Sequence, residues 1–72
     1  MIGKIVSDNM RVLRSKNHLS QREVAEKIGV HVTSYIAWEK DASKVKISVI
    51  ERLAKLYGVS IDVFFAENIY NM

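Results

Sequence analysis

The sequence predicts a single all-α domain made of five helices. Apolar residues recur at spacings of three and four in successive segments, and a glycine directly follows two of these segments. A serine opens a capping sequence before one of them. No segment shows the alternation of apolar and polar residues, bounded by hairpin turns, that is typical of β-strands. The spacing of apolar residues and the stop signals therefore favour helices throughout.

The first helix is expected at residues 4–16, and the second follows Ser20. The first carries apolar residues on one face: Val6, Met10 and Leu13. Ser20-Gln21-Arg22-Glu23 is a capping box, in which the serine hydroxyl accepts from the N–H of Glu23 and the glutamate accepts from the serine N–H. Gly29 ends the second helix, because glycine adopts the left-handed C-terminal conformation without steric strain.

The third helix is expected at residues 32–40 and the fourth at residues 47–57, where Gly58 ends it. The predicted inner face of the fourth helix consists of Ile47, Ile50, Leu53, Ala54 and Tyr57. Ser60 is expected to cap a short fifth helix at residues 61–66. The domain should therefore span residues 1–66, followed by a short tail at residues 67–72.

Composition excludes several classes of protein. The 72 residues include no cysteine, which excludes disulfides and thiolate metal sites and favours an intracellular, cytoplasmic protein. Apolar runs stay far below the roughly 20 residues of a membrane helix, and the start lacks a secretion signal. His18 and His31 have no third ligand at useful spacing, so we expect no metal and no other cofactor.

An enzyme is also disfavoured. The chain contains no Gly-x-Ser-x-Gly motif, no phosphate-binding glycine loop and no paired acid–base residues. A helical bundle of 72 residues has little room for a substrate pocket. We therefore expect no small-molecule substrate.

The formal net charge of +3 is concentrated in the first part of the chain. Residues 1–46 carry nine Lys and Arg against five Asp and Glu, whereas residues 47–72 carry two against three. A basic N-terminal part suits a polyanionic partner such as nucleic acid.

Residues 21–40 read as two helices joined by one tight glycine turn, an arrangement that places a helix in the DNA major groove. Together with the segments that follow, they make the chain resemble the lambda repressor-like, Cro-type helix-turn-helix family over residues 4–66. The matching segments are Leu19-Ser20-Gln21, Val24-Ala25, Ile28-Gly29-Val30, Trp38-Glu39, Leu53-Ala54-Lys55 and Gly58-Val59-Ser60. The resemblance implies a five-helix domain that binds a double-stranded DNA operator.

The resemblance also implies roles for individual residues. Gln21 would hold a phosphate at the start of the second helix, and Arg14 and Glu39 would form a largely buried ion pair. Three residues match base-reading positions, and two lie beside them: Val32, Thr33 and Ala37, with Ser34 and Ile36. Three lysines fall in or beside the loop that would contact the DNA backbone: Lys40, Lys44 and Lys46.

The chain departs from the family pattern at several positions. His31 occupies an N-cap position that is usually Ser or Thr, and Tyr35 replaces a more frequent Ile or Val. Asp41 stands where glycine is usual and Val45 where proline is common. The loop after the third helix is therefore expected to have its own shape.

The outward face of the third helix permits two hypotheses. Its residues are largely apolar and lack the Arg, Asn and Gln side chains that make bidentate contacts with bases. In the first hypothesis the helix reads DNA weakly, through thymine methyls and a hydroxyl, while lysines supply most of the affinity. In the second, an exposed apolar face binds a cognate repressor protein. The residues of that protein contact would be His31, Val32, Ile36, Ala37 and Lys40.

The second hypothesis has a parallel among related proteins. The chain resembles small lytic-side regulators of temperate phages of Gram-positive bacteria, including a modulator-of-repression type that acts as an antirepressor on its cognate repressor. The two hypotheses are compatible, because a complex with the repressor can itself occupy DNA. A homodimer would be closed by apolar residues near the C-terminal end: Phe64, Phe65, Ile69 and Tyr70.

Overall fold

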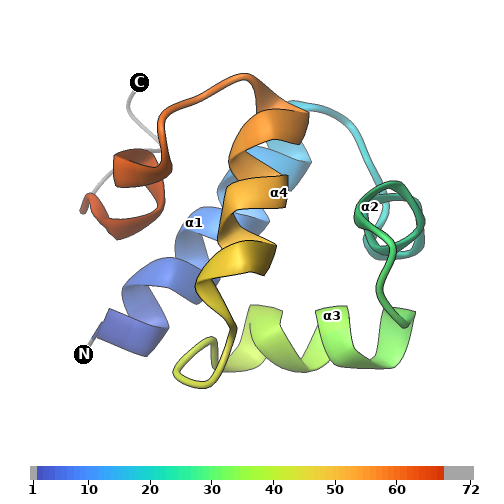
Figure 1. The fold of residues 1–72 in the computed structure, drawn as a ribbon, viewed down its shortest axis with the longest axis horizontal. Helices are drawn as coiled ribbons and strands as arrows, with labels where there is room; N and C mark the ends of the chain where they lie inside the picture. Colours follow the sequence, from blue (N-terminus) through green and yellow to red (C-terminus); the bar gives the residue numbers. More distant parts are fainter. Residues whose placement is uncertain (1, 68–72) are drawn as a thin grey trace.

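The computed structural model describes residues 2–67, which form four α-helices and a 3-10 helix (Figure 1). These are α1 (Ile2–Lys16), α2 (Gln21–Ile28), α3 (Val32–Lys40), α4 (Ile47–Tyr57) and the 3-10 helix η1 (Ile61–Phe65). Within these residues no strand occurs, so the all-α prediction is confirmed. None of the helices in residues 2–67 is long and apolar enough to cross a membrane.

The helices leave one long side of α3 uncovered. In Figure 1, α4 crosses in front of α1 in the middle of the molecule, and η1 lies at the left. Helix α3 runs along the lower edge, and α2 is seen end-on at the right. Helix α3 contacts α1 and α2, and η1 contacts α1 and α4. Because these contacts all lie on the inner side of α3, its lower side faces solvent.

The predicted stop signals define α2 and α4. Ser20 accepts a hydrogen bond from the N–H of Glu23 at 3.0 Å, and the Glu23 carboxylate accepts from the N–H of Ser20 at 2.9 Å, which completes the capping box. Gly29 has φ of 74° and Gly58 has φ of 67°, both in the left-handed region. Each glycine N–H bonds back to carbonyls of the preceding turn, so the chain reverses direction abruptly after both helices.

The core joins all five elements. Its buried apolar side chains are Val6, Met10, Leu13, Val24, Ala25, Ile28, Tyr35, Ala42, Val49, Ile50, Leu53, Ala54 and Phe64. The predicted inner face of the first helix is confirmed, because Val6, Met10 and Leu13 are buried. The predicted inner face of α4 is wrong at its start, because Ile47 is 58% exposed and Val49 is buried instead. Both lie at the margins of the apolar stripe, so periodicity could not decide between them.

The fifth predicted helix is a 3-10 helix that ends at Phe65 and not an α-helix that ends at residue 66. Its geometry fits the buried side chain of Asn9 in α1. The Asn9 amide donates to the carbonyls of Val63 at 3.1 Å, Phe64 at 2.8 Å and Ala66 at 2.7 Å. Backbone carbonyls at a helix end lack partners within the helix, and here a side chain from another helix satisfies them.

Phe64 and Phe65 have opposite environments. Phe64 is fully buried in the core, so its prediction as a dimer contact is wrong: packing within one chain already uses its ring. Phe65 is 39% exposed. Ile69 and Tyr70, the other predicted dimer contacts, lie outside the described residues.

We predict that Asn9→Ala lowers the free energy of unfolding by about 2 kcal/mol, because it strands buried carbonyls of η1. Chemical denaturation monitored by circular dichroism measures this change. Asn17→Ala is the matched control, since Asn17 is exposed and makes a hydrogen bond within its own helix end, to Leu13. Equal losses in the two variants would contradict the role of Asn9.

Candidate nucleic-acid interface

The outer face of α3 is narrow and consists of small or polar side chains. Thr33, Ala37 and Lys40 are exposed, and their spacing of four and three residues places them on one stripe. Ser34 flanks the stripe and is half-buried. A hydroxyl, two methyl groups and an ammonium therefore face solvent along the uncovered side of α3.

The apolar residues predicted on the outward face of α3 are only partly exposed in the structure. Val32 is half-buried and packs against the core, and Ile36 is half-buried as well. Neither belongs to the large apolar side chains that are exposed in residues 2–67. Helices α1 and α2 both pack on α3 and cover part of its surface.

The inner face of α3 carries a buried ion pair. Glu39 is 2% exposed, and its carboxylate accepts two hydrogen bonds from Arg14 of α1. The distances are 2.7 Å from Arg14 Nε to Glu39 Oε2 and 3.1 Å from Arg14 Nη2 to Glu39 Oε1. Such a bidentate pair fixes both the position and the rotation of a helix. The arrangement agrees with the ion pair expected from the sequence.

Gln21 joins the same cluster. Its side-chain amide donates to Glu39 Oε1 at 3.1 Å, so the first residue of α2 is tied to α3. The sequence predicted that this amide holds a phosphate. An amide nitrogen carries two hydrogens, so one can bond Glu39 while the other is offered to a phosphate. The structure therefore gives Gln21 a positioning contact that the sequence did not reveal.

Two further residues of α1 hold the C-terminal end of α3, and the sequence analysis missed both. Ser7 donates to the carbonyl of Trp38 at 2.8 Å, and Arg11 donates to the carbonyl of Glu39. Ser7, Arg11 and Arg14 are spaced by four and three residues, so they form a polar stripe beside the apolar one. The spacing of these polar residues was the signal in the sequence, because polar groups that face a neighbouring helix usually form hydrogen bonds with it.

Charges in this cluster are well defined. Burial raises the pKa of Glu39, but hydrogen bonds from Arg14 and Gln21 outweigh burial and hold the pKa below its ordinary value. The hydrogen bond to Glu39 likewise raises the pKa of Arg14. Burial raises the pKa of Tyr35, and it raises that of Tyr57 to about 12. The cluster therefore holds one ionised pair beside two neutral phenols at neutral pH.

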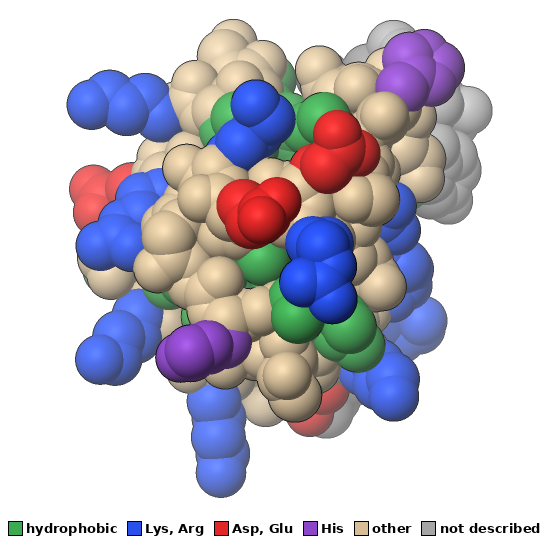
Figure 2. Space-filling view, turned by 90° about the vertical axis from the view of Figure 1, so that its right-hand side faces the viewer, with side chains coloured by type: hydrophobic (Ala, Val, Ile, Leu, Met, Phe, Trp, Pro, Cys, Tyr) green, Lys and Arg blue, Asp and Glu red, His purple; other side chains and the backbone are tan. Residues whose placement is uncertain are grey.

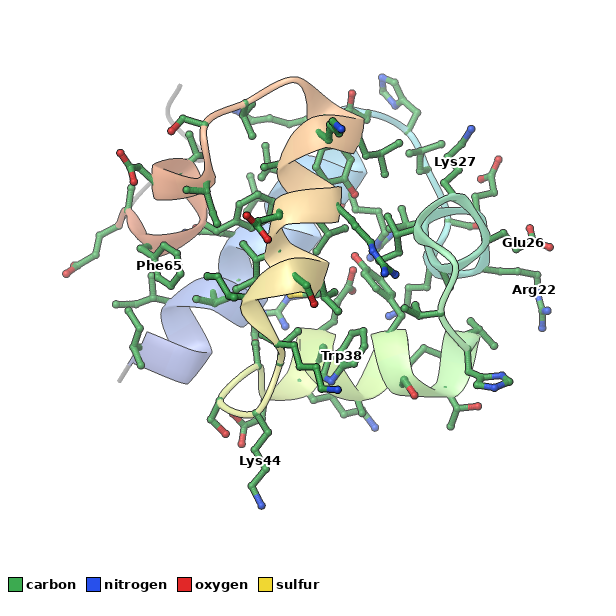
Figure 3. The ribbon with its side chains drawn as sticks, in the orientation of Figure 1. Arg22, Glu26, Lys27, Trp38, Lys44 and Phe65 are labelled. Carbon is green, nitrogen blue, oxygen red and sulfur yellow. The ribbon has the colours of Figure 1, made fainter. Side chains whose placement is uncertain are left out.

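The loop after α3 presents lysines on the same side as the outer face. Lys40, Lys44 and Lys46 are exposed, and Figure 3 shows Lys44 pointing away from the molecule below the loop. The loop is anchored, because Ala42 is buried and Asp41 Oδ1 accepts from the N–H of Ser43 at 3.0 Å. The lysines are thus exposed side chains on an anchored backbone, at and next to the C-terminal end of α3.

The outer face of α2 is less suited to a polyanion. Figure 2 views the molecule from this side and shows acidic side chains near the middle, with Lys and Arg side chains both beside them and around the edges. Glu23 and Glu26 are exposed on α2 beside Arg22 and Lys27. The side formed by α3 and its loop carries three exposed lysines against one exposed carboxylate, that of Asp41, so its charge balance is more basic.

His31 is the N-cap residue of α3, but its side chain makes no capping hydrogen bond. It is exposed at the edge of the outer face. Within residues 2–67 no cluster of His, Asp and Glu has the arrangement of a metal site.

Comparison with known proteins agrees with this geometry. A family model described as "Helix-turn-helix" matches residues 10–64. The transcriptional repressor RstR of the cryptic phage CTXphi in Vibrio cholerae is 46% identical over 55 residues, which cover 76% of this chain and 50% of RstR. The chain thus spans about half the length of RstR, and the similarity concerns only part of that repressor.

Two other proteins extend the comparison. The control protein C.SmaI of Serratia marcescens is 35% identical over 60 residues, which cover 83% of this chain and 71% of C.SmaI. The crystal structure of a hypothetical transcription factor, NHTF from Neisseria, superimposes with a TM-score of 0.85. It is 27% identical and covers 92% of this chain and 76% of its own.

We predict that Glu39→Gln lowers the free energy of unfolding by about 3 kcal/mol near neutral pH, because it leaves the Arg14 charge unpaired. The pKa of Glu39 is lower in the folded state than its ordinary 4.5, so the pair's contribution is complete above about pH 4.5. It is lost as the pH falls through the folded-state value. The difference between wild type and variant should therefore shrink in acid.

Denaturant titrations at a series of pH values measure this difference. Glu26→Gln is the control, because Glu26 is exposed on α2 and points away from the molecule (Figure 3). A difference between wild type and Glu39→Gln that stays constant down to pH 2 would rule out the ion pair as its source.

Proposed function

The chain belongs to the helix-turn-helix family of lambda repressor- and Cro-like DNA-binding regulators, and from this premise we propose that it regulates transcription in a phage-type genetic switch. It would do so in the cytoplasm of its host cell by placing α3 in the major groove of a double-stranded operator. The similarity to RstR, named as a phage transcriptional repressor, supports the phage-type setting.

One observation carries this proposal: polar contacts hold the inner side of α3, and its outer side is exposed to solvent. Thr33 and Ala37 face solvent from the middle of the helix, and Lys40 ends the same stripe. In the groove, their methyl groups would contact thymine methyls and the Thr33 hydroxyl would bond a base edge. Val32 and Ser34 lie at the margins of this surface and would contribute less.

Backbone contacts would supply most of the affinity. Lys44 and Lys46 extend from the loop beyond α3, and Gln21 lies at the N-terminal end of α2, where free N–H groups attract a phosphate. Together they would grip phosphates on either side of the groove that α3 enters. An interface dominated by lysines should depend steeply on salt and discriminate modestly between sequences.

The domain at residues 1–66 would act as a symmetric dimer. Dimers of helix-turn-helix proteins read two half-sites one helical turn apart, about 34 Å. The outer face of one α3 has few hydrogen-bonding groups and would specify few base pairs. Two subunits, each bound to one half-site, would recognise a longer and more specific operator.

Direct binding of a cognate repressor through α3 is the alternative. It would need Val32 and Ile36 as contact residues, and both are half-buried. What stays exposed on α3 is smaller and more polar than a protein-docking helix requires. DNA is therefore the better-supported partner of this face.

We predict that Lys44→Gln weakens operator binding and reduces the slope of log K against log salt by about 0.9, since one phosphate contact is lost. Fluorescence anisotropy with labelled DNA from its own promoter region, at several salt concentrations, measures both quantities. Lys27→Gln is the matched control, because Lys27 projects from α2 away from the loop (Figure 3). Equal effects of the two variants would count against the loop as the backbone grip.

A second arm of this experiment adds the cognate repressor of the alternative hypothesis as a purified protein regulator. Binding to that regulator, in a sample that shows no salt-sensitive DNA binding, would overturn the proposal in favour of the antirepressor.

We also predict that Thr33→Val reduces the preference for the operator over a scrambled duplex about fivefold, which corresponds to roughly 1 kcal/mol for one lost hydrogen bond. The salt slope should not change, because valine keeps the shape and removes only the hydroxyl. Competition binding with both duplexes gives the ratio. An unchanged preference would mean that Thr33 does not read a base.

A further inference from the structure

A groove runs along the outer side of α4, between this helix and the C-terminal end of α2. Two adjoining hollows of about 550 and 340 Å³ form it, and Arg52 and Lys55 line both. The first hollow is also lined by Glu51 and Val59, and the second by Lys27, Ile28 and Leu56. In Figure 1, α4 lies in front of α1, and none of the other described elements covers its front side. We call this surface the α2–α4 groove.

The α2–α4 groove is more basic than acidic. Lys27, Arg52 and Lys55 contribute three positive charges against the single carboxylate of Glu51, and all four residues are exposed. Figure 3 shows Lys27 projecting from α2. Cations from two helices thus meet along one groove, at a distance from the outer side of α3.

Arg52 is anchored where the two hollows adjoin. Its Nη1 donates to the carbonyl of Ile28 at 3.1 Å, and this carbonyl belongs to the last turn of α2, where partners within the helix are lacking. A guanidinium has five N–H donors, so this one bond leaves others for a ligand. Because the anchored side chain loses little further freedom on binding, it is well prepared to pair with a carboxylate.

Apolar side chains lie beside these charges. Leu56 and Val59 are half-buried, and Ile28 is almost completely buried. A phosphate backbone gains nothing from apolar groups, and the carboxylate of Glu51 would repel it. A protein segment can use both parts of the groove, because it can offer carboxylates to the cations and an apolar side chain to the rest.

We propose that the α2–α4 groove binds an acidic segment of a partner protein. Carboxylates of this segment pair with Lys27, Arg52 and Lys55, while an apolar side chain packs against Leu56 and Val59. Arg52, Lys55 and Val59 are spaced by three and four residues and form one stripe along α4, which an amphipathic helix can follow. This inference goes beyond the proposed function and does not depend on DNA binding.

A partner in this groove would leave the proposed DNA-binding surface free. In Figure 1, α4 runs from the loop beside α3 to the opposite edge of the molecule, and Lys55 lies in its last turn. The outer side of α3 faces away from that edge. The protein would therefore be able to bring a partner to DNA, in addition to occupying the operator itself.

NMR titration of the isotope-labelled protein tests the proposal. The probe is a synthetic helical peptide that carries a stripe of glutamates beside a stripe of leucines. Saturable shifts are expected in the amide signals of α4 and of the C-terminal end of α2. Lys27→Gln and Lys55→Gln should each weaken binding about threefold, the effect of losing one exposed ion pair. Both residues are exposed, so the fold should persist.

Lys44→Gln is the matched control. It removes the same charge from the loop after α3 and should leave peptide binding unchanged, because Lys44 does not line the α2–α4 groove. The operator should show the reverse pattern, with binding weakened by Lys44→Gln and not by Lys27→Gln or Lys55→Gln. A peptide with alanines in place of the leucines should bind about tenfold more weakly, since the apolar contacts are lost.

Four results would overturn the proposal. The first is the absence of a saturable shift in the signals of α4 and α2, and the second is a set of shifts confined to α3 and its loop. The third is an equal loss of peptide binding in all three lysine variants, which would indicate general attraction between opposite charges. The fourth is a Lys55→Gln variant that loses operator binding but keeps peptide binding, which would make the groove a DNA contact.

Discussion

The ion pair between Arg14 and Glu39 is the interaction on which the presentation of α3 depends. It joins the first helix to the third across the core, and both charges are held in place by further hydrogen bonds. A paired charge in the interior contributes little net stability compared with apolar packing, but it tolerates only one arrangement of its partners. The pair therefore fixes the rotation of α3 about its own axis. That rotation decides which side chains reach solvent.

The rest of the polar stripe on α1 serves the same purpose. Ser7 and Arg11 bond carbonyls at the C-terminal end of α3, where a helix has none of its own donors left. With Arg14, they hold the helix near its last turn, from which Lys40 and the loop lysines extend. Because α3 is held in one position at this end, short side chains such as Thr33 and Ala37 can be presented in a defined place. Long, flexible side chains are then not required on this surface.

Apolar side chains are distributed unevenly over the surface. On α3, Val32 and Trp38 pack against the core, which leaves a small and largely polar surface for a polyanion. Ile2, Ile47 and Phe65 stay exposed around a cavity that opens onto the core. Because Ser43 and Val45 of the loop after α3 also line this cavity, the apolar surface adjoins the loop that carries Lys44.

The sequence by itself determined the helix order, the capping box at Ser20, the ends at Gly29 and Gly58, and the family. These features depend on local spacing and on backbone conformations that only certain residues adopt, so short segments encode them. The pairing of Arg14 with Glu39 came from the family resemblance. Only the tertiary structure decided how much of α3 is covered, that Ile47 is exposed while Val49 is buried, and that Phe64 is internal. It also revealed the buried amide of Asn9, which bonds carbonyls more than fifty residues away. Each of these depends on which neighbour covers a side chain, and residues far apart in the chain settle that together.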